Sequence, residues 1–134
     1  MNHDSLKLLA GNKPKKKRKS KYGNKQITVD GVLYHSEGEY RRECELKVQQ
    51  RAGIIKNLKR QVEFSFDIND VHVCKYIADW TYNICDDGTF VVEDWKGFET
   101  QEFKIKKKLM IACHGLSIWT NKKVNAHCAL EYPF

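Results

Sequence analysis

Charged residues interrupt two neighbouring apolar runs in the stretch YIADWTYNICDDGTFVVEDWKGF. Asp79 lies in the first run, and Asp94 and Lys96 lie in the second, where apolar side chains would be easier to bury. In a β-strand, side chains two residues apart point to the same face. Asp94 and Lys96 are therefore expected to share a face, with Glu93 and Trp95 on the other one.

The connection between the two runs decides whether Asp79 joins that face. Asp87-Gly88 is a strong signal for a two-residue hairpin turn. With this turn, Asp79 falls directly opposite Lys96, and directly opposed residues share a face. The spacing therefore predicts a cluster of Asp79, Asp94 and Lys96, and a one-residue change in loop length would break it.

Two carboxylates and an ammonium group on a half-buried face permit two interpretations. One is a buried salt-bridge cluster that only stabilises the fold. The other is a divalent metal site, because Mg²⁺ prefers oxygen ligands and needs few carboxylates when waters and phosphate oxygens complete its shell. Such an ion could polarise a phosphate and lower the pKa of a bound water. Lys96 would then position the nucleophile or stabilise developing charge.

The surrounding pattern predicts an α/β protein with a central mixed sheet of four to five strands flanked by helices. A short hairpin is expected first, then the order helix, three strands, helix, strand. The predicted elements are a hairpin over 27–36, a helix over 37–52, strands over 61–66, 71–82 and 89–96, a helix over 99–114 that stops at Gly115, a strand over 116–119 and an edge strand within 124–134.

The first predicted helix has a clear start. Ser36 is a good N-cap, and Glu39 three residues later completes a capping box. The apolar residues Tyr40, Cys44 and Val48 recur every four positions, which predicts one buried stripe.

Composition restricts the class of protein. The 134 residues suit one domain of ordinary size, and no apolar run is long enough to span a membrane. We therefore expect a cytoplasmic protein. The five cysteines are odd in number and show no CxxC spacing, which favours reduced, mostly buried thiols over disulfides. A zinc site formed by His72, Cys74, Cys113 and His127 is a weaker alternative, because no recognised ligand spacing is present.

The net charge of +7 is concentrated at the N-terminus, where residues 1–26 contain nine basic residues and one acidic residue. We expect residues 1–25 to form a disordered basic tail and residues 26–134 to form the folded domain. The tail could bind DNA phosphates, act only as a solubilising segment, or serve as a nuclear localisation signal. Its candidate DNA-binding residues are Lys15, Lys16, Lys17, Arg18 and Lys19.

Further basic residues lie on the two predicted helices. Arg41 and Arg42 are candidates for either phosphate contacts or ion pairs. On the second helix, Lys104, Lys107 and Lys108 could contact phosphates near the site or form a solvated face. Trp80 and Trp95 are expected to face away from the charged cluster and to pack under helices.

The ordered set of Asp79, a hairpin and Asp94-Trp95-Lys96 resembles the core of the PD-(D/E)XK nuclease superfamily. That core has the order helix, three strands, helix, strand. The stretches YGNKQITVDGVLYHSEGEYRRECEL, KYIADWTY, VVEDWKGFETQEFKIKKKL and HGLSI are similar to a family of small phage-encoded proteins that is linked to Holliday-junction resolvases. The resemblance covers roughly residues 21–118, although Ala78 stands where the superfamily name has proline.

The resemblance implies a role for each matching residue. Glu39 would be the acidic residue of the helix, with Glu43 as its substitute one turn later. Asp79 and Asp94, together with Glu39, would bind the metal ion, which would be Mg²⁺ with Mn²⁺ as a substitute. Lys96 would be the catalytic lysine.

The implied function is a metal-dependent DNA endonuclease. Its substrate would be either branched DNA or a duplex that it nicks at a particular sequence. A resolvase would require a homodimer to cut two strands symmetrically, whereas a nickase could act as a monomer. The alternative is a non-catalytic DNA-binding protein, or a protein-binding inhibitor, that retains the nuclease fold.

Overall fold

The computed structural model describes residues 25–121. Three predictions concern segments outside this range: the basic tail with its five candidate DNA-binding residues, the edge strand within 124–134, and any site that includes His127. Within the described residues, no helix is both long enough and apolar enough to cross a membrane.

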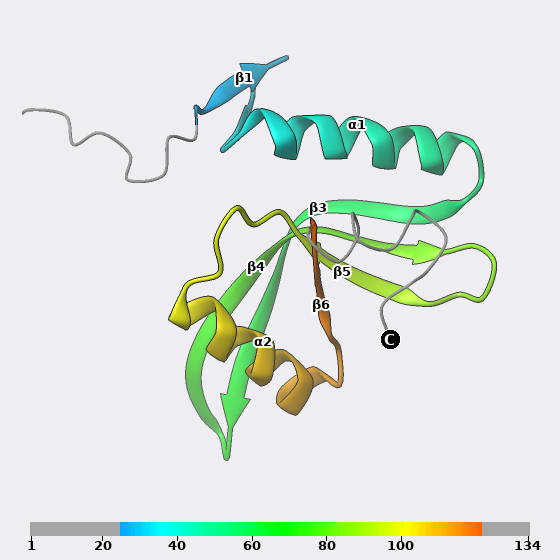
Figure 1. Cartoon of the computed structure of the whole chain (residues 1–134). Helices are drawn as coiled ribbons and strands as arrows, with labels where there is room; N and C mark the ends of the chain where they lie inside the picture. The colour runs from blue at the N-terminus through cyan, green and yellow to red at the C-terminus, as the bar shows by residue number, and fades with distance from the viewer. Residues whose placement is uncertain (1–24, 122–134) are drawn as a thin grey trace, which may run out of the picture.

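The described residues form an α/β arrangement in which α1 and α2 pack against a mixed sheet (Figure 1). A four-stranded sheet has the order β3-β4-β5-β6, with β5 and β6 parallel and the other neighbours antiparallel, and β1 and β2 form a separate two-stranded sheet. After the first hairpin, the predicted order of helix, three strands, helix and strand is confirmed. The elements are β1 (Ile27–Val29), β2 (Val32–Tyr34), α1 (Glu37–Arg51), β3 (Ile55–Ile68), β4 (Val71–Ile84), β5 (Phe90–Asp94), α2 (Gln101–His114) and β6 (Ile118–Thr120).

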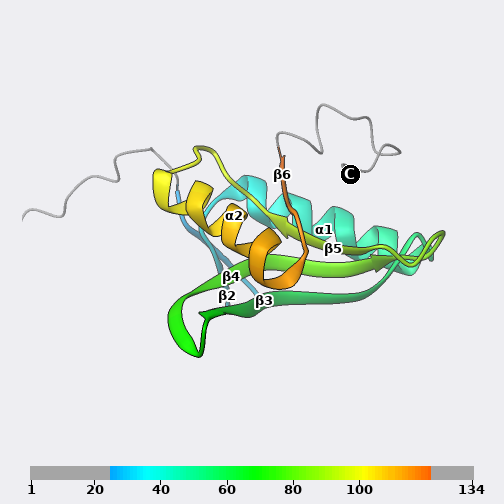
Figure 2. The same ribbon diagram turned by 90° about the horizontal axis from the view of Figure 1, so that it is seen from below.

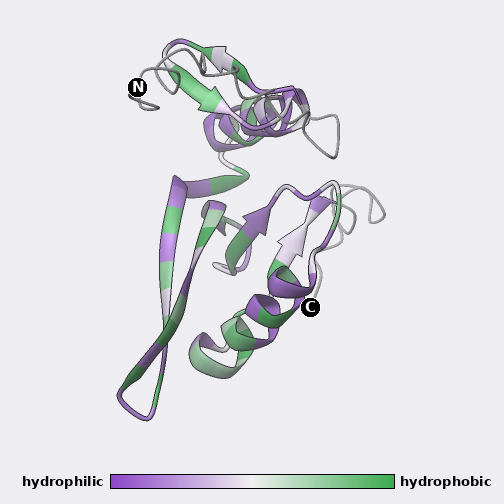
Figure 3. Cartoon of the chain, turned by 90° about the vertical axis from the view of Figure 1, so that its left-hand side faces the viewer, coloured by the Kyte–Doolittle hydropathy of each residue, from purple (hydrophilic) through white to green (hydrophobic). Residues whose placement is uncertain are grey.

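The hairpin of β3 and β4 is longer than predicted, with 14 residues in each strand. It passes α1 at one end and α2 at the other, as Figures 1 and 2 show from two directions. Hydrophilic and hydrophobic residues alternate along it (Figure 3). This alternation extends beyond the predicted 61–66 strand, since one face of the hairpin lies against the helices and the other faces solvent.

The start of α1 forms as predicted. The Oγ of Ser36 accepts a hydrogen bond from the N–H of Glu39 at 3.1 Å. In return, Oε2 of Glu39 accepts the N–H of His35 at 2.9 Å. These two bonds satisfy donors that would otherwise lack partners at the entrance to the helix, so Ser36 and Glu39 fix where α1 begins.

The predicted buried stripe of α1 is wrong. Val48 is 60% exposed and Cys44 is also exposed. The face that packs against the sheet instead carries three charged residues and a single leucine, namely Glu39, Arg42, Glu43 and Leu46. Polar residues occupy the interior because partners on the sheet pair with them, which apolar periodicity cannot reveal.

The prediction of mostly buried thiols is also wrong. Cys44 and Cys85 are exposed, whereas Cys74 and Cys113 are partly buried. All four thiols are free, as expected. The fifth, Cys128, lies outside the described residues.

The apolar core has two parts, one beneath each helix. Leu46 of α1 packs with Trp80, Tyr82 and Val91, and Phe103 of α2 belongs to the cluster that contains Tyr76, Ala78 and Val92. Along β4, the even-numbered residues Tyr76 and Ala78 therefore belong to the cluster under α2, and the next two, Trp80 and Tyr82, belong to the cluster under α1. The change occurs between Ala78 and Trp80, which places Asp79 where the two clusters meet.

A buried ion pair joins α1 to β5. Arg42 donates from Nε to Oε1 of Glu93 at 2.6 Å and from Nη2 to Oε2 at 3.1 Å. The hydroxyl of Tyr82 donates to the same Oε2 at 2.7 Å. The side chain of Glu93 is 1% exposed. Arg42 therefore forms an ion pair, and so does Arg41, which contacts Glu37 on the surface at 2.6 Å.

We expect Arg42→Met to destabilise the protein strongly, because it would leave the Glu93 carboxylate buried without its cation. Loss of one partner of such a pair costs about 3–5 kcal/mol. Arg41→Met is the matched control and should change stability little, since both members of its pair are exposed. Urea denaturation measures both. Equal losses in the two variants would contradict a structural role for the buried pair.

Candidate functional site

The loop between β4 and β5 differs from the predicted turn. The N–H of Ile84 donates to the carbonyl of Thr89 at 2.9 Å, which leaves a four-residue loop instead of a two-residue one. Trp80 pairs with Glu93, so the register continues to place Asp79 opposite Asp94 and not opposite Lys96. The shift is two residues, and the side-chain period of a strand is two. The predicted pairing is therefore wrong, but the shared face survives.

Asp94 is the buried member of the cluster, with a side chain that is 1% exposed. Its Oδ2 accepts a hydrogen bond of 2.6 Å from the hydroxyl of Tyr76. Its Oδ1 lies 3.1 Å from Nζ of Lys96, yet has no hydrogen bond of good geometry within residues 25–121. One oxygen of a buried carboxylate thus lacks a hydrogen-bond donor, which is uncommon and marks this position as a functional candidate.

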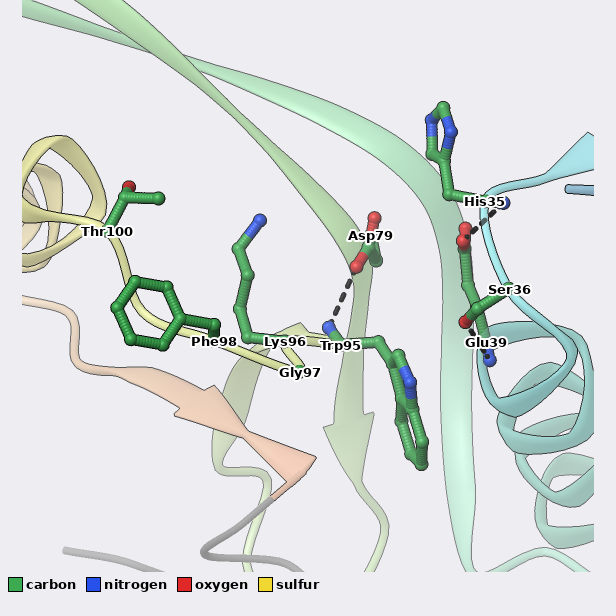
Figure 4. Close-up of a pocket in the computed structure, with 9 residues that line it drawn as sticks. All are labelled: His35, Ser36, Glu39, Asp79, Trp95, Lys96, Gly97, Phe98 and Thr100. Atoms are coloured by element: carbon green, nitrogen blue, oxygen red, sulfur yellow. Dashed lines mark hydrogen bonds between the residues drawn. The ribbon is translucent and has the colours of Figure 1, made fainter. Parts of the chain in front are cut away.

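Asp79 lies beside Asp94 and is held by the main chain. Its Oδ2 accepts the N–H of Trp95 at 2.8 Å (Figure 4). Burial, followed by the negative charges of Asp94 and Glu39, raises the pKa of Asp79 from 3.8 to about 7, although the Trp95 N–H and Lys96 oppose this shift. Asp79 therefore binds a proton at a pH where most aspartates are ionised.

Lys96 is fixed at both ends. Its backbone N–H donates to Oδ1 of Asn121, just beyond β6, at 3.0 Å. Its Nζ lies near Oδ1 of Asp94 and 4.9 Å from the ring centroid of Phe103. The aromatic face and the carboxylate both attract the ammonium group, which directs Lys96 to the same side as Asp79.

Glu39 faces the cluster from the opposite wall of a cavity of about 430 Å³ (Figure 4). Asp79 and Lys96 line this cavity, whereas Glu43 does not. Glu43 instead forms ion pairs with Lys47 at 3.0 Å and with Arg60 at 2.8 Å. The structure thus places Glu39, and not its substitute, at the cavity.

The two tryptophans point away from the cluster, as expected. Trp80 is fully buried under α1, and its Nε1 donates to Oε2 of Glu43 at 3.4 Å. The ring of Trp95 packs against Gly38 of α1, where an added Cβ would lie 2.6 Å from Cζ2 of the ring. Only glycine leaves room for this ring, so the close approach positions the start of α1 relative to the end of β5.

Two residues at the cluster were not predicted. Gln61 of β3 donates from Nε2 to Oδ1 of Asp79 at 3.4 Å, and its backbone has a φ of 53°. A non-glycine residue in this region costs free energy and often accompanies a functional site. Tyr76 anchors Asp94 through its hydroxyl. For Tyr76, the only signal in the sequence is its even-numbered position, shared with Trp80, in the predicted 71–82 strand. No sequence signal distinguishes Gln61.

Residues 19–126 match the family described as "Protein of unknown function (DUF1064)". The chain belongs to this family. No curated protein and no solved structure matched the chain.

Whether the lysines of α2 contact DNA in this DUF1064 member stays a prediction. Lys104, Lys107 and Lys108 line a shallow apolar depression with Ile105 and Ile111, and none of the cluster residues borders it. Lys107 is also paired with Glu99 at 3.2 Å.

The zinc alternative receives no support from the described residues. Among them, no three His, Cys, Asp or Glu side chains gather in a way that could hold a metal ion. His72 instead contacts Oδ1 of Asp67 at 2.8 Å. Asp79 and Asp94 lie side by side, but Glu39 is not close enough to form a group of three potential metal ligands with them.

We expect Asp79→Asn to stabilise the protein at pH 8 in buffer that contains EDTA. Because the pKa of Asp79 in the folded state is about 7, the stability that comes from its protonated form is complete below about pH 4 and is lost as the pH rises through 7. The gain in Tm over wild type should be at least about 5 °C at pH 8 and close to zero at pH 4.

Differential scanning calorimetry across this pH range tests the expectation. Asp67→Asn is the control, since Asp67 is exposed and its hydrogen bond with His72 lowers its pKa. A gain for Asp79→Asn that does not change with pH would show that the charge of Asp79 is not its source.

Proposed function

We propose that this protein is a metal-dependent DNA endonuclease of the PD-(D/E)XK type. The observation that supports the proposal most is the meeting of Asp79, in the middle of β4, with Asp94 and Lys96 at and just after the end of β5. The cavity that Asp79 and Lys96 line is also lined by Glu39. The order of α1, β3, β4, β5, α2 and β6 matches the order expected of that superfamily. The D-x-K segment begins at Asp94, the last residue of β5, which is the third strand after α1.

The residues present suit a divalent cation. Asp79 and Asp94 supply hard carboxylate oxygens, and the buried Oδ1 of Asp94 has no hydrogen-bond donor of good geometry in the described residues. Burial and mutual repulsion disfavour two negative charges here, and a cation would relieve both effects. Asp79 and Asp94 would hold Mg²⁺ or Mn²⁺, with Glu39 as the third carboxylate that we propose.

A bound Mg²⁺ would polarise the scissile phosphate and lower the pKa of the attacking water. The protein residues have separate roles around this chemistry. Tyr76 and the Trp95 N–H fix the orientation of the two carboxylates. Lys96 would place a positive charge where the phosphate gains negative charge in the transition state. Preorganised electrostatic stabilisation of this kind is usually the largest single contribution to catalysis. Gln61 holds Asp79 from the neighbouring strand.

The basic N-terminal segment would add affinity for DNA that does not depend on sequence. We propose that the enzyme acts on DNA in the cytoplasm of its host cell. The two candidate substrates are a four-way junction and an intact duplex that the enzyme would nick on one strand.

A plasmid nicking assay with Mg²⁺ or Mn²⁺ tests this function. We expect the wild type to convert supercoiled plasmid to open circles or linear DNA, and Asp94→Asn and Lys96→Met each to reduce the rate about 100-fold or more. The matched controls are Asp67→Asn and Lys56→Met, which remove exposed charges on the same hairpin and should retain full activity. A labelled four-way junction is assayed in parallel.

Two results would overturn the proposal. Intact plasmid and intact junction with the wild type and either metal would favour a non-catalytic binding protein or an inhibitor. Equal activity in the wild type and both site variants would place any observed cleavage elsewhere.

Metal binding can be measured without activity. We expect saturating Mn²⁺ at pH 8 to raise the Tm of the wild type, because an ion bound only to the folded state at about 100 times its Kd stabilises by about 2.7 kcal/mol. Asp94→Asn should remove most of this shift, and Asp67→Asn should retain it. An equal shift in all three proteins would indicate that the ion binds away from Asp94.

A further inference from the structure

A second cavity of about 420 Å³ lies on the other side of Lys96, between β4 and α2. Lys96 and Thr100 line both this cavity and the one that contains Asp79 and Glu39. Figure 4 shows Lys96 between Asp79 on one side and Thr100 on the other. The two cavities are therefore neighbours, with the ammonium group of Lys96 at their border.

The two cavities carry opposite charge. The first contains the carboxylates of Glu39 and Asp79 against one lysine. The second, which we term the basic cavity, contains Lys75, Lys96 and Lys106 against Glu102 alone. An acidic cavity attracts a cation and repels a phosphate unless the cation is bound, whereas a basic cavity attracts a phosphate directly.

The lysines of the basic cavity have partners that a phosphate could replace. Lys106, whose side chain is 23% exposed, pairs at 3.0 Å with Glu102, whose side chain is 77% exposed. Lys75 pairs with Glu63 at 3.2 Å, and both of these side chains are more than half exposed. Pairs in which the carboxylate is largely exposed to water contribute little to stability. Both ammonium groups can therefore turn toward a DNA phosphate without disturbing the fold.

The remaining walls suit the sugar that links two phosphates. Phe103 forms the buried side of the cavity, and Ile77 is 44% exposed at its edge. An apolar surface between cationic groups matches a deoxyribose between phosphates, and contacts of this kind position DNA without reading its sequence.

We propose that the basic cavity binds the DNA phosphate adjacent to the scissile one, through Lys75 and Lys106. The DNA strand then runs from the Asp79 cavity, over Lys96, toward the β3–β4 hairpin, and not over the outer face of α2 that carries Lys104 and Lys108. This inference rests on the proposed function, since it uses the same site.

Fluorescence anisotropy with a labelled duplex in EDTA measures binding in the absence of cleavage. We expect Lys75→Gln/Lys106→Gln to weaken binding about 10-fold at 100 mM salt and to make the slope of log K against log salt less steep by about 1 to 2. The matched control, Lys104→Gln/Lys108→Gln, removes the same charge from the outer face of α2 and should change the affinity less than about twofold.

A second pair of variants gives an effect of opposite sign. Glu102→Gln frees Lys106 from its partner and should tighten binding about threefold, as expected for one additional unopposed charge near a phosphate. Glu45→Gln is the control, because Glu45 is an exposed partner of Arg42 and does not line the basic cavity. It changes the net charge equally and should leave the affinity unchanged. Circular dichroism confirms that all variants fold.

The outcomes separate the two proposals. If the wild type cleaves DNA but the Lys104/Lys108 variant loses as much affinity as the Lys75/Lys106 variant, or more, the path through the basic cavity is wrong and the nuclease function stands. Equal affinity in the Glu102 variant and the wild type would also count against the path. If the wild type neither binds nor cleaves DNA, both proposals fail.

Discussion

Two adjacent carboxylates at the end of β5 impose the main constraint on this structure. Glu93 and Asp94 are both about 1% exposed, and neighbours in a strand point to opposite faces. Burying an ionised carboxylate is unfavourable unless charged or hydrogen-bonding groups surround it. Each therefore needs its own partners: Arg42 and Tyr82 on one face, and Tyr76 and Lys96 on the other. These contacts fix α1 against the sheet and place the D-x-K segment beside β4.

The two faces satisfy this requirement unequally. Both oxygens of Glu93 accept hydrogen bonds, so this face is a completed structural contact. On the other face, Oδ1 of Asp94 has only the nearby ammonium of Lys96. The pKa of Asp79 is raised first by its burial and then by repulsion from Asp94. Such an arrangement lowers the stability of the fold. Sites that carry out chemistry commonly contain groups with perturbed pKa values of this kind.

The sequence predicted the features that depend on local periodicity and local caps. Alternation correctly assigned Asp79 and Asp94 to one face and Trp80 and Trp95 to the other. The shared face survived a wrong loop length because the error was an even number of residues. Ser36 with Glu39 located the start of α1, and Gly115, whose φ is 67°, located the end of α2. Each of these signals depends on residues that are close together in the chain, which is why the feature could be predicted from the sequence alone.

What the sequence determined by itself is therefore the order of the elements and the set of charged residues available to one face of the sheet. The tertiary structure alone decided which charges meet. The apolar spacing of Tyr40, Cys44 and Val48 predicted the wrong face of α1, because the true inner face includes Arg42, whose partner Glu93 lies 51 residues away. Gln61 reaches Asp79 only through the pairing of β3 with β4. Hydrophobic periodicity records burial along one element, whereas the stability of a buried charge depends on partners that only folding brings together.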